Sequence, residues 1–380
     1  MINVRTFIRV LLSSGLFSAA LVSVNAHALD FGAFGDINHS FNSEDNTTNA
    51  FALGGLDFYA RQDIDDMTQV FFEYVFETGG SGEIVTDVER LSITRKFNEN
   101  FSLTAGRVHS PLGYWNHHYH HGVLLQDTYS RPGFLDFEDG PTAIFPTHVI
   151  GLMASGDVFN VANGELEYNV AMGNSSSINS EGGFNPTLSS LPKPEIDVNN
   201  ASDNSDGKLF VARIAYMPNN KPVSVGITAM KNTVVESGDP TAGALATTGT
   251  PLVKQTLYGA DVKYDQGPFS FLTEYYHMKD DNQVGPSGSN SASAFFVQFG
   301  YNVTDPLKVT YRYESVSFDE AADSYFRILD TQEGINHVVD FRYELTESNA
   351  LYLEINRNDP DANGVDSDTT YILDWAFMMI

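Results

Sequence analysis

A short segment at residues 115–122, WNHHYHHG, holds four of the ten histidines in the chain. They are His117, His118, His120 and His121. Imidazole is a common ligand for transition metals, and its unperturbed pKa of about 6.5 lies nearer to neutral pH than that of other side chains. Three interpretations therefore compete: a metal site, a group of charges that responds to pH, or a solvated or locally packed polar loop.

These interpretations make different demands on the structure. A metal site needs His117 and His121 to converge, and a spacing of four residues achieves this only on a helical turn. A pH-responsive segment must line an aqueous passage, where protonation between pH of about 5 and 7.5 would change conductance or selectivity. A packed polar loop needs neither condition, so the position of the segment in the fold has to distinguish the three interpretations.

A second segment, DPDANGVDSD at residues 359–368, matches the start of a calcium-binding loop. Asp359, Asp361 and Asn363 supply oxygens at alternate positions, and Gly364 supplies the bend. The twelfth position lacks the glutamate that normally closes such a loop, so we expect only weak Ca²⁺ affinity, about 10⁻⁴–10⁻³ M. Such a site could bridge the protein to anionic lipid head groups. A plain turn with solubilising acids is the alternative.

Motifs for hydrolytic or covalent chemistry are missing from the sequence. It contains no G-x-S-x-G, no H-E-x-x-H and no glycine-rich phosphate-binding loop. We therefore expect no enzyme activity, no catalytic residue and no cofactor beyond a weakly bound divalent cation such as Ca²⁺. A hydrolase that lacks these motifs stays open as an alternative.

Composition narrows the class of protein. Residues 1–28 combine early positive charge, an apolar run and an A-x-A site, which predicts a secretory signal cleaved after Ala28. Lys and Arg number 21 against 49 Asp and Glu, a formal net charge of -28, so nucleic acid is not an expected partner. The chain has no cysteine and, beyond the signal, no apolar run of about 18 residues, so we expect neither disulfides nor a transmembrane helix.

Apolar and polar residues alternate along most of the remaining chain, residues 29–380. In TQVFFEYVFET at residues 68–78, for example, Phe72 and Tyr74 alternate with Glu73. A period of two predicts half-buried β-strands. We predict sixteen strands, near residues 30–41, 50–61, 68–78, 87–97, 101–107, 146–155, 164–174, 207–217, 222–233, 254–264, 268–279, 292–303, 306–318, 334–344, 349–358 and 368–380.

The connections distinguish a membrane barrel from a soluble sandwich. Long connections follow the odd-numbered strands and short connections follow the even-numbered strands along the whole series. An outer-membrane barrel requires this alternation, with long loops outside and tight turns in the periplasm, whereas a sandwich does not. The apolar faces are also rich in aromatic residues, as in interfacial girdles. We therefore predict an all-β, antiparallel, up-and-down transmembrane barrel of about sixteen strands.

The opposite faces of the strands are polar, as the lumen of a wide barrel should be. Acids outnumber bases there. The acids are Asp57, Glu73, Glu77, Glu165, Glu167, Asp261, Glu274, Glu314, Asp340, Glu344, Glu354 and Asp374, and the bases are Arg61, Arg90, Arg213, Lys263, Lys308, Arg312 and Arg342. The long loops are acidic too, with Arg131, Lys193 and Arg327 as their bases. We expect this charge to concentrate cations at the outer mouth and to repel anions.

In strand number, loop alternation and an aromatic last strand, YILDWAF, the chain resembles the outer-membrane porins of Gram-negative bacteria. The resemblance implies export through the periplasm to the cell outer membrane, with lipid and lipopolysaccharide as surroundings. It suggests a homotrimer. It also implies that the longest connection, residues 108–145, folds inward as a third loop and narrows the channel.

In porins an acidic part of the third loop faces arginines on the wall. By position in the loop, the resemblance assigns the acidic part to Glu138 and Asp139 and the wall arginine to Arg107. The residues expected to line the constriction are Arg107, His117, His118, His120, His121, Arg131, Glu138, Asp139, Arg312 and Arg342.

Together these features predict a water-filled channel for passive diffusion of small hydrophilic solutes and ions, with a preference for cations. The alternative is a closed or ligand-specific outer-membrane barrel, either a metal-responsive binding or uptake protein or a barrel hydrolase. Stepwise conductance would indicate the channel, whereas saturable binding or substrate turnover without conductance would indicate the alternative.

Overall fold

The computed structural model describes residues 29–42, 49–78, 82–119, 122–136, 142–181, 196, 205–285, 287–319, 324–329, 331, 333–361 and 366–379. The predicted signal, residues 1–28, lies outside these residues. So do several residues that the sequence singled out, namely His120, His121, Glu138, Asp139, Asn363 and Gly364.

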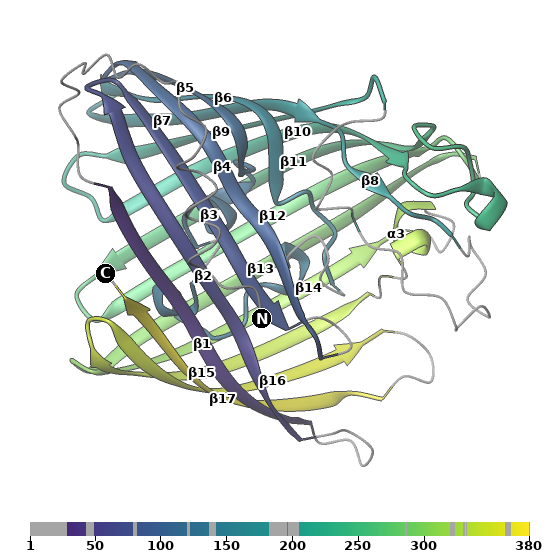
Figure 1. The fold of residues 1–380 in the computed structure, drawn as a ribbon. Helices are drawn as coiled ribbons and strands as arrows, with labels where there is room; N and C mark the ends of the chain where they lie inside the picture. Colours follow the sequence, from purple (N-terminus) through teal and green to yellow (C-terminus); the bar gives the residue numbers. More distant parts are fainter. Residues whose placement is uncertain are drawn as a thin grey trace, which may run out of the picture.

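The described chain forms a closed antiparallel barrel of 16 strands with one short strand beside it (Figure 1). The strands are β1 (Asp30–Asn42), β2 (Ala50–Asp65), β3 (Thr68–Thr78), β4 (Ile84–Asn98), β5 (Phe101–His109), β6 (His148–Val161), β7 (Gly164–Asn174), β8 (Ser177–Ile178), β9 (Lys208–Pro218), β10 (Val223–Glu236), β11 (Pro251–Gln266), β12 (Phe269–Asn282), β13 (Ser289–Thr304), β14 (Leu307–Phe318), β15 (Gly334–Thr346), β16 (Asn349–Pro360) and β17 (Asp368–Met379). The ring closes because β1 pairs with both β2 and β17. The predicted fold is confirmed, and the sequence missed only β8, which pairs in parallel with the end of β10.

Helices are short and lie in the connections. Within the described ranges they are α2 (Gly113–Tyr119), η1 (Val123–Leu125), η2 (Gly133–Leu135), η3 (Pro240–Ala242) and α3 (Ser324–Leu329). Among the described residues, no helix has both the length and the apolar character needed to cross a membrane.

The alternation of side chains between the two faces of a strand gives the barrel an apolar outside and a polar inside. On β17, Leu373 and Trp375 are 56% and 55% exposed, whereas Asp374 between them is 1% exposed. On β12, exposed Tyr275 follows buried Glu274. Most of the acids predicted to face inward are buried, namely Asp57, Glu73, Asp261, Glu274, Glu314, Asp340, Glu354 and Asp374.

The third loop spans residues 110–147 between β5 and β6, and its described residues, 110–119, 122–136 and 142–147, lie against the inner face of the barrel on an apolar core. Phe134 of the loop packs against Tyr276 on β12 and Phe296 on β13, with ring centroids 6.0 and 6.2 Å apart. Buried apolar side chains of β9, β10, β11 and α3 extend the same core. Burial of each large apolar side chain contributes about 1.5–3 kcal/mol. One side of the lumen is therefore filled by an apolar core, which a reading of polar inward faces did not anticipate.

Strand β5 leaves its neighbour β4 early, where the third loop begins to turn inward. The ladder between the two strands ends at the pair of Leu91 with Arg107, whereas β5 continues beside β6 to His109. Gly106, just before this point, has a φ of 135°, a conformation that L side chains rarely adopt. A Cβ at this position would also meet the carbonyl oxygen of Leu91. The seam between β4 and β5 thus requires glycine at position 106.

We predict that Gly106→Ala lowers the free energy of unfolding by about 1–3 kcal/mol, because the substitution adds backbone strain and a clash with the neighbouring strand. Thermal unfolding of the detergent-solubilised barrel would measure the effect. Gly267→Ala is the matched control, since Gly267 also has positive φ, 59°, but a Cβ there meets nothing within 4 Å. An equal loss in the two variants would contradict the steric account of the seam.

Candidate functional site

Arg312 on β14 anchors the third loop, residues 110–147, to the wall. Its guanidinium donates to the hydroxyl oxygen of Thr128 at 2.6 Å and to the carbonyl oxygen of Ser130 at 2.9 Å. It also pairs with Glu314, two residues further along β14, at 2.6 Å. Alternate residues of a strand share a face, so this pair is built into the strand. Arg312 is fully buried, so its guanidinium holds the loop against the wall and is not accessible to a solute.

Carboxylates of the wall accept hydrogen bonds from backbone N–H groups of the same loop. Four such bonds, 2.5–3.1 Å long, join Tyr129 to Asp340, Ser130 to Glu354, Gly133 to Glu314 and Trp115 to Glu274. A typical intramolecular hydrogen bond contributes about 0.5–1.5 kcal/mol, and a buried N–H group needs a partner. These acids, expected to line open water, therefore hold the loop in place.

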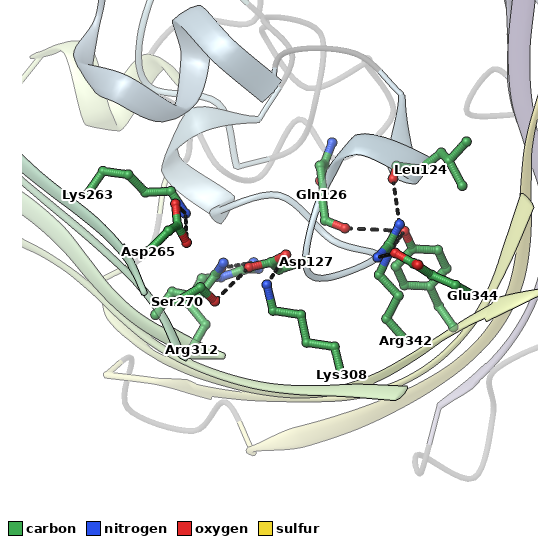
Figure 2. Close-up of polar contacts among 12 residues, drawn as sticks. Leu124, Gln126, Asp127, Lys263, Asp265, Ser270, Lys308, Arg312, Arg342 and Glu344 are labelled. Atoms are coloured by element: carbon green, nitrogen blue, oxygen red, sulfur yellow. Dashed lines mark hydrogen bonds and ion pairs between the residues drawn. The ribbon is translucent and has the colours of Figure 1, made fainter. Parts of the chain in front are cut away.

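Basic side chains at the short-turn end of the wall also contact the loop (Figure 2). Lys308 pairs with Asp127 of the loop at 2.6 Å, and Ser270 donates to the same carboxylate at 3.1 Å. Arg342 donates to the carbonyl oxygen of Leu124 at 3.1 Å. Arg342 also pairs with Glu344 and donates to the hydroxyl of Tyr352. The positive charge of these wall bases is therefore largely compensated by acids or taken up by the loop backbone.

A cavity of about 460 Å³ lies on the other side of the loop, between it and strands β1, β2, β3, β15 and β16. Four carboxylates line it, Asp36, Asp57, Glu77 and Asp136, together with one guanidinium, Arg131. Arg131 stacks over the ring of Trp115, with its Cζ atom 4.9 Å from the ring centroid. Glycines of β1 and β2 and asparagines of β15 and β16 complete much of the lining. The charged side chains of the lining are therefore predominantly acidic.

Two histidines of the cluster lie within the described residues, and both are on α2. His117 places Nε2 4.0 Å from a carboxylate oxygen of Glu167, and burial, with the positive charge of His118 and Arg213, lowers its pKa to about 3. His118 stacks on Tyr114 and bonds to the carbonyl oxygen of the same residue at 2.8 Å. His117 is therefore neutral between pH 5 and 7.5, and a pH response there needs another group.

The remaining sequence candidates lie apart from one another. Arg107 pairs with Asp87 at 3.1 Å and donates to the backbone of Glu89 at the seam of β4 and β5. It is not among the residues that line the acidic cavity. Asp359 pairs with Arg357 on β16 at 3.0 Å, so a Ca²⁺ ion at this loop would have to displace an arginine. The calcium loop itself stays a prediction.

The sequence analysis missed Asp36, which is buried on β1 and lies close to Asp374 on β17. Asp36 follows glycines in FGAFGD, and this context did not mark it as facing inward. Adding a Cβ at Gly54 of β2 would collide with the carboxylate of Asp36, so the glycine makes room for the acid. The β1–β17 closure brings the two acids together, and only the folded barrel reveals this pairing.

Comparison with known proteins identifies solved structures that share this fold. No protein-family model and no curated protein sequence matches the chain. Among solved structures, OmpT in its trimer form, an outer membrane protein of Vibrio cholerae, is 14% identical with a TM-score of 0.58 over 93% of this chain and 99% of that one. The anion-selective porin from Comamonas acidovorans is 12% identical with a TM-score of 0.58 over 92% and 99%. The outer membrane channel DcaP of Acinetobacter baumannii is 12% identical with a TM-score of 0.59 over 95% and 99%.

These likenesses show the fold alone, a β-barrel of the type found in outer-membrane porins. The apolar and aromatic outer wall fits a location in the outer membrane. At such low identity the shared fold does not carry solute or ion preference from one protein to another.

We predict that Arg312→Gln loosens the third loop, because it leaves the buried carboxylate of Glu314 without its cation. Breaking a buried pair costs about 3–5 kcal/mol. Limited proteolysis should then cut within residues 122–136, where the parent protein resists. Arg357→Gln removes an exposed pair and is the control, for which we expect parental resistance. Equal resistance in both variants would show that the apolar core alone fixes the loop.

We predict that acid destabilises the barrel partly through His117. Its pKa in the folded chain, about 3, is below the ordinary value of 6.5, so only the unfolded chain takes up the proton. Stability is therefore lost as pH falls below 6.5, by about 2 kcal/mol at most at pH 5. The side chain is 24% exposed, which reduces the effect. His117→Gln should flatten the change in unfolding free energy between pH 7 and 5, while His277→Gln, at an exposed site, should leave it unchanged.

Proposed function

We propose that the protein is a water-filled outer-membrane channel for passive diffusion of small hydrophilic solutes and ions, with a preference for cations. The observation that carries the proposal is the cavity beside the third loop, with four carboxylates against one guanidinium. A cavity that charged side chains line, between an inward loop and a barrel wall, is the arrangement expected of a channel constriction. The loop covers one side of the lumen and leaves the cavity on the other.

Cation preference follows from where the charges lie. Asp36, Asp57 and Glu77 project from neighbouring strands β1, β2 and β3 into one cavity. A cleft lined by one sign of charge with low-dielectric walls raises the local concentration of counter-ions. The bases of the opposite wall, such as Arg312 and Lys308, contact the third loop and its carboxylates and do not line the cavity. The field in the cavity should therefore be negative.

Assembly and surroundings form part of the same proposal. OmpT of Vibrio cholerae, which shares the fold, is described in a trimer form, and this supports a homotrimer for the present chain. The belt of exposed apolar and aromatic residues would contact membrane lipid and lipopolysaccharide. Non-enzymatic transport is proposed on the same basis, because the buried acids described above are used to hold the loop or to line the cavity.

We predict stepwise conductance when the purified barrel is inserted in a planar lipid bilayer, with a reversal potential that favours cations under a salt gradient. The triple variant Asp36→Asn, Asp57→Asn, Glu77→Gln should lower the cation-to-anion permeability ratio at least about twofold, because it removes most of the negative charge of the cavity. The preference should also shrink at about 1 M salt, where the Debye length falls to about 3 Å.

A matched control removes three acids at a turn that lies outside the cavity lining, through Asp63→Asn, Asp65→Asn and Asp66→Asn. This variant should keep the parental permeability ratio. Anion preference in the parent protein would overturn the electrostatic argument. A folded barrel that never conducts, but binds a ligand saturably or turns over a substrate, would favour the closed or enzymatic alternative.

A further inference from the structure

Three side chains capable of binding a metal converge at the seam between β4 and β5. The Nε2 atom of His148 contacts a carboxylate oxygen of Glu89, and the Nε2 atom of His109 lies 3.9 Å from the same oxygen. The ligand atoms of all three residues lie within 4.8 Å of one another. All three side chains are more than nine-tenths buried. This group is separate from the cavity and from the histidines of α2.

The two histidines meet because they are a direct register pair. His109 is the last residue of β5 and His148 the first of β6, and the two lie opposite each other in the antiparallel ladder. Alternate residues share a face, so His109 lies on the same face as Arg107. The ladder between β4 and β5 ends at Arg107, so β4 forms no backbone hydrogen bonds with β5 beyond this residue. Side chains of β4 can therefore contact the end of β5 and the start of β6.

Glu89 is presented by an irregularity in β4. The pairing of β4 with β3 passes from Arg90 opposite Glu73 directly to Val88 opposite Tyr74, which leaves Glu89 as the extra residue of a bulge. Bulges re-aim a side chain at places where a regular strand would direct it elsewhere. The Nε atom of Arg107 donates to the carbonyl oxygen of Glu89 at 2.9 Å and so fixes the bulge beside the histidines.

The donor set is the one that Zn²⁺ prefers. Two imidazoles and one carboxylate bind Zn²⁺ in many proteins, with a fourth position left to water or another donor. For tetrahedral bonds of about 2.0–2.1 Å, neighbouring ligand atoms lie about 3.3 Å apart. To reach this value, His109 Nε2 must approach the carboxylate oxygen from 3.9 Å, and His148 Nε2, which contacts the same oxygen, must move away from it. The nearby guanidinium of Arg107 is balanced by Asp87 at 3.1 Å, which limits its repulsion of a cation.

We propose that Glu89, His109 and His148 form a binding site for a divalent transition metal, with Zn²⁺ as the best match, that ties the root of the third loop to β4. The site bridges strands that are no longer joined by backbone hydrogen bonds at this level. Binding to the folded state alone would stabilise it. The proposal is independent of ion conduction, so it stands or fails separately from the channel function.

The test uses the full folded barrel in detergent and Zn²⁺ alone as the probe. After metal removal, equilibrium dialysis with metal analysis should find one Zn²⁺ per chain that depends on these residues, and the melting temperature should rise with Zn²⁺ concentration. Because the site is buried, Zn²⁺ is added both to the folded protein and during refolding. Replacement by Co²⁺ should give the visible absorption of a four-coordinate nitrogen and oxygen site.

Variants decide which residues hold the metal. Glu89→Gln keeps the shape of the side chain. The single variants Glu89→Gln and His148→Ala should each weaken Zn²⁺ binding at least about tenfold. His277→Gln, at an exposed position on β12, should bind as the parent does. Heat-dependent mobility on gels would confirm that each variant is folded before binding is measured.

A second control separates the site from the loop histidines. Replacing His117, His118, His120 and His121 together with Gln should leave the seam-dependent Zn²⁺ in place. The proposal is overturned if the parent binds no Zn²⁺, if binding disappears only in this quadruple variant, or if folded His148→Ala and Glu89→Gln proteins keep parental affinity. In the last two cases the seam is an ordinary ion-pair network.

Discussion

The closed backbone ladder is the constraint on which the rest of this structure depends. In lipid every backbone N–H and C=O group must find a partner within the protein, and a sheet meets this demand only when its first and last strands pair. Here β1 pairs with β17 along residues 33–42. Closure fixes the positions of the inward side chains, because each strand is held on both sides. It also brings Asp36 close to Asp374, one acid from each end of the chain.

The third loop divides the lumen into two unlike halves. Towards β12 and β13 it packs through Phe134 and other apolar groups, and towards β14–β16 it is held by Arg312, Asp340 and Glu354. The space that remains lies beside β1–β3, and acids outnumber bases among the charged side chains that line it. The channel proposal therefore depends on which charges the loop has covered, and a count of the charges on the inward faces would not reveal this.

Folding of the long third loop into the barrel disrupts the sheet where the loop begins. Strand β5 must leave β4 so that the loop can enter the barrel, and this breaks the ladder beyond Arg107. Gly106 allows the close approach just before the break, and Arg107 spans it through Asp87 and the backbone of Glu89. The polar groups gathered at this seam replace the missing backbone hydrogen bonds. The same gathering produces the histidine and glutamate group of the proposed metal site.

The sequence by itself determined the barrel, its strands and the side of each strand that meets lipid. These follow from an alternation of period two and from loop lengths, which are local properties of the chain. Only the tertiary structure decided the roles of the inward residues. Arg312 looked like part of a channel wall but is a buried anchor, and Glu89, His109 and His148 carried no local motif. Their meeting depends on the break in one ladder and a bulge in another, and such contacts between distant segments leave no periodic trace in the sequence.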